Sequence, residues 1–561
     1  SRMVQKGQHI LLLLFVLGCA NCYPYFQREI PNGQYVPHPC KNITWKGIGH
    51  VNPLGGGARN KFGLDFSAAG EKWTRELCML DSDLDGKTNG EELGDPLCTW
   101  RKGDPRPSTT GITHPGICEP FDSPRCFNFN KWVDCNYGDF ACKGLEEPDL
   151  VKHTLRFPRT KVPDKPTNYR CISFDLPTDA DYHMIAFEPI IDNSDVLHHI
   201  ALYGCEDNAV DVTEPTGCFM TRKECRTVIA GWAVGLPGEC LPREAGISIG
   251  TKGFKKAYMQ MHWTNHKVGE VNYTDSSGLT LYLTKNKRKY DAGILNVGQE
   301  YLKLPPGQSR VMQEGICTKE MLSKRMLGPI YVSTVANHMH LIGKSMTVEL
   351  HRDGKLFKTL SHDGHYGYES PVIHRHKPPI AINSGDSIKS TCYFDTTNKT
   401  KTVFNGFGTL DEMCYAFLVV YPKKNLLVDT CVPWKTIDWT LVKYHHFIPF
   451  LKPVIDGCNF AEFKDLTNPK TIALHKLLSD NCHLLSDCLE ECVAAVNEAM
   501  KHPCMKGHIG DYLKEEARKG DLGGQFKDFY SRIDSCNREM AKKTCRRIVF
   551  VPIMQRCGPV P

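Results

Sequence analysis

Beyond its first 22 residues the sequence lacks long apolar runs, and it has no long stripe of Lys and Arg. A membrane-spanning helix needs about 20 consecutive apolar residues, so the sequence predicts no transmembrane segment. The net charge of +6 is spread over 561 residues, which gives no support for nucleic-acid binding. The triple glycine at 55–57 is not a phosphate loop, because no helix and no Lys-Ser/Thr pair follows it.

Cysteine, by contrast, is abundant, with 26 residues in the chain. Residues 1–22 are expected to be a signal peptide, because basic Lys6 precedes a short apolar core at 10–17. An oxidising compartment pairs most cysteines. The glycosylation sequons begin at Asn42, Asn272 and Asn398. We therefore expect a protein that is secreted or lies in a secretory-vesicle lumen.

The composition changes along the chain and predicts a mainly β protein with several domains. Residues 23–105 are rich in Gly, Asn and Asp, and 106–150 form a Cys-rich connector. From 151 to about 445, short β-branched and aromatic runs alternate with turn residues, which is typical of antiparallel sandwiches. Examples of these runs are Leu279–Leu283, Ile330–Val335 and Ala416–Tyr421. From 446 to 561 helical spacing and many cysteines predict a stapled helical tail.

A twelve-residue run from Asp81 to Glu92 matches the calcium-binding loop at its ligand positions. Gly86 allows the sharp turn that this loop requires. An acidic surface turn is the alternative interpretation, and agreement at six positions disfavours it. The predicted calcium ligands are Asp81, Asp83, Asp85, the carbonyl of Lys87, Asn89 through a water molecule, and Glu92.

The residues around this loop carry a resemblance to a known family. The run Ile30-Pro-Asn-Gly-Gln-Tyr-Val-Pro-His-Pro-Cys40, the segment from Gly49 to Gly57 and Trp73 resemble temptin, a secreted, pheromone-associated protein. The similarity spans about 23–100. It implies a small, disulfide-tied, calcium-binding module that acts outside cells.

Two histidine pairs stand in β-prone stretches, at His198-His199 and at His338-Met-His340. In a strand, residues i and i+2 lie on one face, so His338 and His340 can share an ion. Adjacent His198 and His199 need a twist, a bulge or different ring nitrogens to do so. Neutral imidazole is a ligand for copper and zinc.

Two rival pairs have the same spacings. His374-Arg-His376 is followed by Lys-Pro-Pro, which suggests an exposed turn, and His445-His446 falls where the β pattern ends. Spacing alone does not exclude these two pairs as metal ligands.

The context of the first two pairs resembles the copper type II, ascorbate-dependent monooxygenases. The resemblance covers about 155–440 and includes Gly231-Trp-Ala-Val-Gly-Leu-Pro237, Met259-Gln-Met-His262 and Asp411-Glu-Met413-Cys414. It implies two tandem jelly-roll domains, at 151–300 and 301–445, and two copper ions with ascorbate as the electron donor. The implied ligands are His198, His199 and His262 for the electron-transfer copper, and His338, His340 and Met413 for the catalytic, oxygen-binding copper.

The same resemblance bears on the substrate. Peptide-amidating members have Asn and Tyr where this chain has Tyr415 and Phe417, and an Arg where it has Ala336. A buried carboxylate without donors is costly, so a flat or apolar small molecule is expected, with O2 as the second substrate. The alternative is a non-enzymatic secreted signalling or copper-binding protein.

The resemblance also implies disulfide pairings. A cysteine that the family has four residues after Cys317 is replaced here by Met321. The implied disulfides are Cys171–Cys218, Cys205–Cys225, Cys392–Cys414 and Cys317–Cys431.

Overall fold

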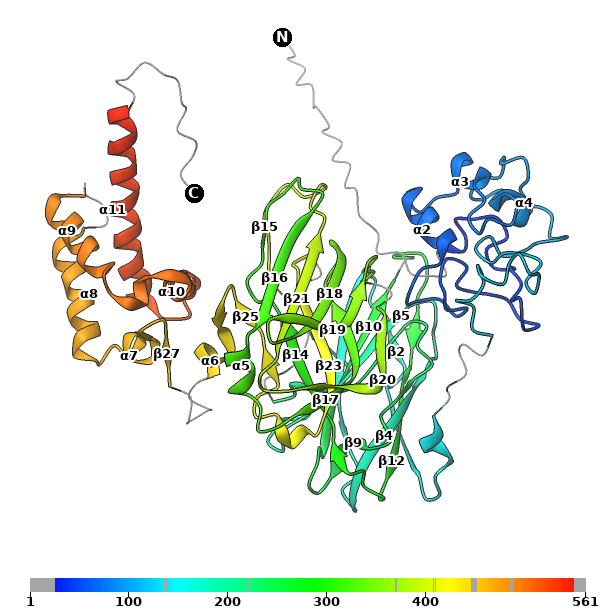
Figure 1. Ribbon diagram of the computed structural model, residues 1–561, viewed down its shortest axis with the longest axis horizontal. Helices are drawn as coiled ribbons and strands as arrows, with labels where there is room; N and C mark the ends of the chain where they lie inside the picture. The colour runs from blue at the N-terminus through cyan, green and yellow to red at the C-terminus, as the bar shows by residue number, and fades with distance from the viewer. Residues whose placement is uncertain are drawn as a thin grey trace, which may run out of the picture. The chain divides into compact units, whose positions relative to one another are not determined.

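The structure is a computed structural model that describes residues 26–548 except 136–139, 141, 219–221, 223, 266, 369–370, 407, 409, 445–451 and 484–487. The expected signal peptide at 1–22 lies outside these residues. Figure 1 labels the helices and strands along the chain. Contacts divide the chain into two units. The first comprises Ser1–Ala292 and His365–Ile373, and the second comprises Gly293–Gly364 and His374–Pro561.

The N-terminal module has few regular elements, and a small core with disulfides holds it together. Its helices are α2 (Lys61–Ala68), α3 (Arg75–Met79) and α4 (Asn89–Glu92). Each begins after a side-chain cap, as at Asn60, whose Oδ1 accepts from the Gly63 amide. Fully buried Trp45 lies in its core, and Trp132 packs there from the expected connector. Its disulfides are Cys40–Cys135, Cys78–Cys98 and Cys118–Cys126.

The rest of the first unit contains two main sheets. One has six strands, β1 (Val151–Arg156), β12 (Gly278–Thr284), β4 (Asp181–Ile190), β9 (Ala245–Gly250) and β13 (Tyr290–Asp291) in that order, with β8 (Glu239–Cys240) beside β4. The other has five, in the order β6 (Thr216–Gly217), β3 (Thr167–Asp175), β10 (Lys256–Thr264), β5 (Leu197–Gly204) and β7 (Thr227–Ala233). Strand β2 (Thr160–Lys161) pairs with β11 (Thr274–Asp275).

The second unit contains a further pair of main sheets. The five-stranded one runs β20 (Ile373–Ile382), β17 (Ile330–His338), β23 (Tyr415–Tyr421), β14 (Gly293–Gly298) and β24 (Thr430–Cys431). The four-stranded one runs β16 (Val311–Cys317), β21 (Ser387–Phe394), β18 (Gly343–Arg352) and β19 (Lys355–Asp363). Short pairs join β15 (Lys303–Leu304) to β22 (Val403–Phe404) and β25 (Pro433–Trp434) to β26 (Ile437–Asp438). Helices α5 (Lys319–Ser323) and α6 (Trp439–Tyr444) complete this region.

The alternation of buried and more exposed residues explains why these segments form strands. Along β21 every second residue is buried, ending at Phe394, as one face of a pleated strand requires. The predicted runs at 279–283, 330–335 and 416–421 lie inside β12, β17 and β23. The mainly β prediction is therefore confirmed.

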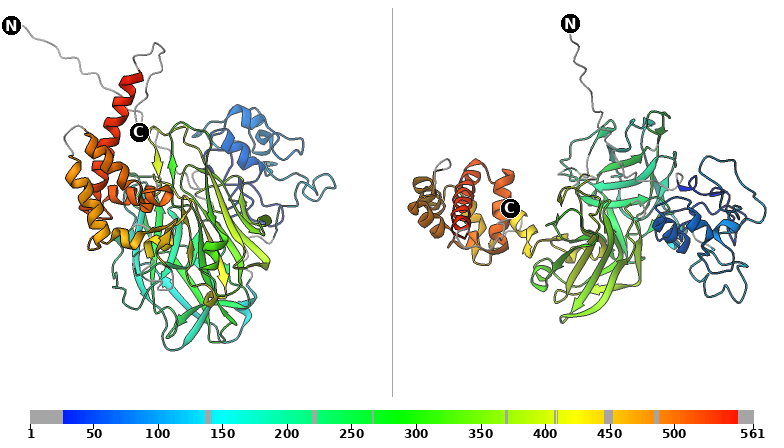
Figure 2. Two further views of the ribbon diagram at one scale, coloured as in Figure 1. Left: turned by 60° about the vertical axis from the view of Figure 1, so that its left-hand side comes forward. Right: turned by 90° about the horizontal axis from the view of Figure 1, so that it is seen from above.

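The tail after residue 452 is helical, as its spacing predicted (Figure 2). A short pair, β27 (Val454–Ile455) and β28 (Cys458–Asn459), precedes α7 (Phe460–Lys464), α8 (Pro469–Asn481), α9 (Glu490–Ala499), α10 (Gly507–Lys519) and α11 (Gly524–Ile548). Phe526 and Phe529 are buried in the tail core. Among its described residues, three disulfides cross-link it, namely Cys458–Cys504, Cys482–Cys492 and Cys488–Cys536.

All four disulfides implied by the resemblance are present, at Cys171–Cys218, Cys205–Cys225, Cys317–Cys431 and Cys392–Cys414. Cys240, which had no assigned partner, pairs with Cys142 of the connector. Among the described residues, no helix combines the length and apolarity that crossing a membrane requires.

Candidate metal centres

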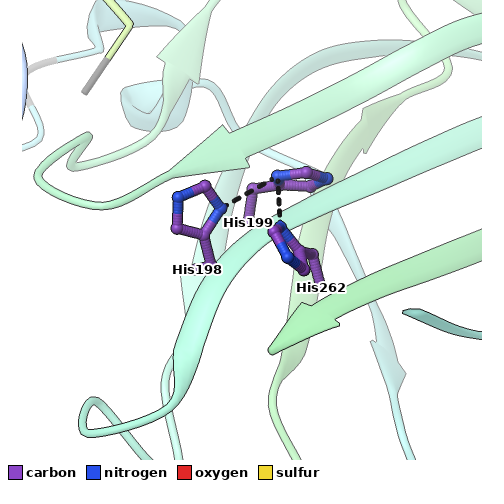
Figure 3. Close-up of side chains that lie close together, drawn as sticks. All are labelled: His198, His199 and His262. Carbon is purple, nitrogen blue, oxygen red and sulfur yellow. Dashed lines mark hydrogen bonds between the residues drawn. The ribbon is translucent and has the colours of Figure 1, made fainter. Parts of the chain in front are cut away.

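Three histidines from neighbouring strands meet in the first unit (Figure 3). His199 on β5 pairs with His262 on β10, and the next pair along joins Leu197 to Trp263. His198 is therefore the extra residue of a β-bulge. A bulge turns adjacent side chains toward one side of the strand, so this irregularity can bring His198 and His199 to a common ion.

The ring nitrogens of this cluster lie at the spacing that a shared ion needs. His199 Nδ1 lies 3.2 Å from His198 Nδ1 and 3.3 Å from His262 Nδ1. Two nitrogens bound at about 2 Å to one ion, at a tetrahedral angle, lie roughly 3.3 Å apart. A single N–H group cannot form hydrogen bonds to all of the converging nitrogen lone pairs, whereas one cation can be bound by all three nitrogens. The cluster therefore fits a metal such as copper.

Burial keeps the His262 imidazole in the neutral, ligating form. His262 is 1% exposed. Its desolvation, and then repulsion from His198 and His199, lowers its pKa well below the usual value. His199 Nε2 lies 3.3 Å from Gln260 Oε1, which accepts a hydrogen bond from Nε2–H and leaves Nδ1 as the lone-pair atom. The sequence pattern did not single out Gln260 for this role.

Aromatic rings flank the cluster. Tyr169 of β3 stacks on His262, with ring centroids 4.2 Å apart and planes at 12°. Tyr368 stacks on His198, at 5.9 Å and 26°. Both tyrosines are half-buried, so they restrict the imidazoles without sealing the site. Neither was predicted, because ring stacking leaves no signature in sequence spacing.

In the second unit, His338 and His340 lie close together, with ring centroids 5.3 Å apart. His338 ends β17 and pairs with Tyr415 of β23. Past the end of the strand, His340 and Met413 are linked through Glu412, whose Oε2 accepts from both backbone amides. Met413 is 1% exposed. His340 Nδ1 lies 3.0 Å from the carbonyl oxygen of Asp411, so Nδ1 carries the proton and Nε2 keeps its lone pair.

The buried carboxylate of Glu412 ties these residues together. Its oxygens accept from the backbone amides of His340 at 2.8 Å, Ile342 at 2.8 Å and Met413 at 3.2 Å. Burial raises the pKa of Glu412 to about 7, although the three amides favour its charged form. The sequence shows Glu412 only as the neighbour of Met413, so its positioning role was missed.

The histidines of the first rival pair, His374 and His376, lie within hydrogen-bond distance of other groups. His374 and His376 lie in strand β20, so the predicted exposed turn is wrong. The Nε2 atom of His374 lies 2.8 Å from Asp363 Oδ1, and that of His376 lies 2.9 Å from the carbonyl oxygen of Leu360. A strand containing Pro forms here because β20 is an edge strand of its sheet. His445 and His446 lie outside the described residues.

The acidic loop of the N-terminal module brings Asp81, Asp83 and Asp85 together, with carboxylate oxygens within 4.8 Å of one another. Glu92 is fully buried, and one of its oxygens has no hydrogen-bond partner among the described residues. Burial and then repulsion from Asp83 raise the pKa of Glu92 to about 9. An uncompensated acidic cluster of this kind fits a cation.

The other two predicted ligands of the loop, Asn89 and Lys87, are held by hydrogen bonds within the module. Asn89 is fully buried, and its Nδ2 donates to the carbonyl oxygen of Leu77 at 2.8 Å and to Ser82 Oγ at 3.0 Å. Lys87 donates its backbone amide to Asp85 Oδ1 at 2.8 Å, which fixes the turn that presents its carbonyl.

Residues expected to bear on substrate lie on the same sheet face as His338. Ala336 pairs with Phe417, whose ring centroid is 6.0 Å from that of His338. The Tyr415 hydroxyl donates to Glu300 and accepts from Asn405 Nδ2 at 3.4 Å. At these three positions the face next to His338 therefore presents a methyl group and two aromatic rings, and none of the three is the cationic donor that a carboxylate would need.

Three family models match the chain. Residues 20–117 match the temptin C-terminal family. Residues 153–270 match the N-terminal domain of the copper type II ascorbate-dependent monooxygenases, and 290–438 match their C-terminal domain. The chain thus contains both domains of this enzyme class, in order, after a temptin-like domain.

Curated relatives carry names from the same class. DBH-like monooxygenase protein 1 of Gallus gallus is 32% identical over 290 residues, covering 48% of this chain and 47% of that protein. Tyramine beta-hydroxylase of Caenorhabditis briggsae is 31% identical over 286 residues, covering 48% of each. Dopamine beta-hydroxylase of Homo sapiens is 29% identical over 323 residues, covering 54% and 52%. The chain spans about half the length of the curated relatives it matches.

Proposed function

We propose that the chain is a secreted copper monooxygenase that hydroxylates an aliphatic or benzylic carbon of a small aromatic or apolar substrate with O2 and ascorbate. The family matches of its two central domains support the class. The proposed copper ligands are His198, His199 and His262 at one centre and His338, His340 and Met413 at the other.

The observation that carries the proposal is the convergence of His198, His199 and His262 from two neighbouring strands. Copper at the two centres would supply one-electron transfer and activation of dioxygen. The difference between the ligand sets supports a division of labour. A thioether is a soft ligand that favours Cu(I), whereas three imidazoles suit a copper that cycles between oxidation states. A simple copper carrier has no need of two chemically different centres.

The chain's own residues would then perform separate tasks. Gln260 and the carbonyl of Asp411 fix the tautomers of His199 and His340. Glu412 holds the backbone of His340 and Met413. Phe417 offers an apolar wall near His338, where an aromatic or aliphatic substrate would lie with its reacting carbon toward that centre.

The remaining proposals concern organisation. We infer a signal peptide at 1–22, a temptin-like module at 23–105, a connector at 106–150, copper domains at 151–300 and 301–445, and a tail at 446–561. Each copper domain would be a jelly-roll sandwich of its two main sheets. Calcium would bind the module through Asp81, Asp83, Asp85, Lys87, Asn89 and Glu92. The sequon residues Asn42, Asn272 and Asn398 are exposed, which suits glycosylation.

The test is copper content together with oxygen uptake. We expect two copper ions per chain, and ascorbate-dependent oxygen uptake with some members of a panel of arylalkylamines and small apolar alcohols. The variant His338→Ala should lose one copper and all uptake. The double variant His374→Ala/His376→Ala has the same spacing and should keep both coppers. Zinc in place of copper, or two coppers without uptake on any substrate, would favour the non-enzymatic alternative.

A further inference from the structure

The triple glycine of the N-terminal module packs against the sheet domain of the same unit. We call residues Asn52–Gly57 the glycine loop and residues Val234–Leu236 the docking turn. The Asn52 side-chain amide donates to the carbonyl oxygen of Gly235 at 2.6 Å. A Cβ atom on Gly56 would lie 2.0 Å from the carbonyl oxygen of Val234. Only glycine permits this approach of the two backbones.

The contact requires glycine on its other side as well. Gly235 has a φ of +88°, and a Cβ atom there would lie 1.7 Å from the carbonyl oxygen of Gly55. Two backbones therefore meet with no side chain between them, and the Asn52 hydrogen bond sets their register. A contact built this way tolerates almost no displacement, because any added atom must separate the two segments.

The docking turn adjoins the three-histidine cluster. Strand β7 ends at Ala233, the register partner of His199, and Val234 is the next residue. Within the turn, the Leu236 amide donates to the Ala233 carbonyl at 3.1 Å, and Trp232 Nε1 donates to the Leu236 carbonyl at 2.6 Å. These bonds make the turn stiff, so a shift of Gly235 is transmitted to the strand beside His199.

The segment that follows the turn is anchored from the N-terminal side too. A Cβ atom on Gly238 would lie 2.9 Å from the ring of Phe140. Two residues later, Cys240 forms its disulfide with Cys142. The module and the connector thus hold both ends of the stretch 234–240, which leads away from the strand next to the cluster.

We propose that the temptin-like module is a positioning element of the three-histidine centre: its glycine loop clamps the docking turn and thereby fixes the strand beside His199. The partner surface of the module is therefore this turn, and the two parts act as one body. The inference rests on the proposed function, because it assumes that copper binds at His198, His199 and His262.

The test compares glycine variants of the full chain, loaded with copper. Gly56→Ala should distort the Cu(II) electron paramagnetic resonance signal of the three-histidine centre and speed copper loss from it to a chelator about tenfold. The matched control is Gly57→Ala. Gly57 also has a positive φ, of +66°, but no atom of the described residues lies within 4 Å of the position that a Cβ atom would take there. The control should keep the wild-type signal. The His338–Met413 centre should be unchanged in both and serves as the internal reference.

A second variant covers the case in which Gly56→Ala does not fold. Asn52→Asp keeps the oxygen that accepts from the Leu54 amide at 2.8 Å but loses the donor to Gly235. It should cause the same spectral change in milder form. Identical signals in Asn52→Asp, Gly56→Ala and Gly57→Ala would overturn the inference while leaving the proposed function intact. A wild-type chain that binds no copper at the three histidines would instead overturn the proposed function.

Discussion

The hydroxyl oxygens of Tyr169 and Tyr368 lie 3.1 Å apart and form a hydrogen bond across the three-histidine cluster. Tyr169 stacks on His262 and Tyr368 stacks on His198, so one hydrogen bond links the rings that restrict two of the three imidazoles. Tyr368 comes from the segment His365–Ile373, which belongs to the first unit although the chain on either side belongs to the second. The cluster is therefore completed by a distant part of the sequence.

The first prediction concerns this tyrosine pair. Tyr368→Ala removes the ring over His198 and should weaken copper at the three-histidine centre by about tenfold, as is usual when a partner that orients a ligand is lost. Tyr368→Phe keeps the ring and loses only the hydroxyl, so it should retain most of the affinity. Competition with a chelator, read separately for each centre, measures both. Equal effects of Ala and Phe would mean that the hydrogen bond, and not stacking, orients His198.

The second prediction separates the two centres by their ligand chemistry. Met413→Ala removes the one soft ligand among the three proposed for the His338–Met413 centre. Binding of Cu(I) there should therefore fall, while binding of Cu(II) falls less. The three-histidine centre should be spared. X-ray absorption of the reduced protein should lose its copper–sulfur contribution. Loss of copper from both centres in equal measure would show that the partition of ligands is wrong.

The third prediction tests the anchoring role of Glu412. Glu412→Ala leaves three backbone amides in a buried site without an acceptor, and each unsatisfied buried group costs about 1–3 kcal/mol. Copper at the His338–Met413 centre should be lost first, since the backbone amides of two proposed ligands, His340 and Met413, donate to that carboxylate. Glu412→Gln keeps one carbonyl acceptor and should lie between wild type and Ala. The control Glu498→Ala, at an exposed residue in a surface ion pair with Lys501, should have no effect on copper.

The sequence was most informative where function depends on residue type and short spacing. The period of two in a strand predicted that the rings of His338 and His340 lie close together. Their centroids are 5.3 Å apart, although β17 ends at His338. The implied Cys392–Cys414 bridge is present and anchors the segment leading to β23. The alternation of buried residues in β17 and β21 was likewise readable from apolar periodicity.

What the sequence could not provide are contacts between segments far apart in the chain. Tyr368 reaches His198 across 170 positions, and Gly235 meets Gly55 across 180, and neither follows from local pattern. The triple glycine was recognised only as something other than a phosphate loop. Its requirement for glycine comes from backbone packing, which only the folded structure displays. The β20 strand was missed because Lys377-Pro-Pro is a turn signal that an edge strand can tolerate.

The fourth prediction concerns a buried ion pair near the position of the lost family cysteine. Arg325 contacts both oxygens of Asp438 at 2.5 and 2.8 Å, with side chains 2% and 8% exposed. Arg325 also donates to the carbonyl oxygen of Met321 at 2.8 Å, so the pair secures the region that the missing bridge would hold. Asp438→Asn leaves a buried guanidinium without its counter-charge and should cost about 3–5 kcal/mol.

Urea unfolding of the second unit, followed by tryptophan fluorescence, measures that loss. Lys501→Ala is the matched control, because its ion pair with Glu498 is exposed on both sides and such pairs contribute little. A loss for Asp438→Asn no larger than for Lys501→Ala would show that the buried pair is not what holds α5 in place.

The fifth prediction links calcium to protons at Glu92. Burial and Asp83 raise the pKa of Glu92 to about 9, so near pH 7.5 its carboxyl is protonated when no cation is bound. Calcium requires the carboxylate, and binding should therefore release about one proton. Calorimetric titration of the full chain in two buffers of different ionisation enthalpy counts that proton, and Glu92→Gln should abolish the release and weaken binding.

The same pKa fixes the sign of the pH dependence. Between the ordinary pKa of Glu and about 9, the folded module holds a proton that the unfolded chain has lost. Without calcium, stability should therefore fall as pH rises through this window. Calcium should remove this slope, because the bound cation keeps Glu92 charged in the folded state. Hydrogen exchange of the amides around Leu77 and Leu93, both buried in the module core, reports this local stability within the intact chain. Calcium binding without proton release, together with a pH-independent exchange rate, would mean that Glu92 is not a ligand of the loop.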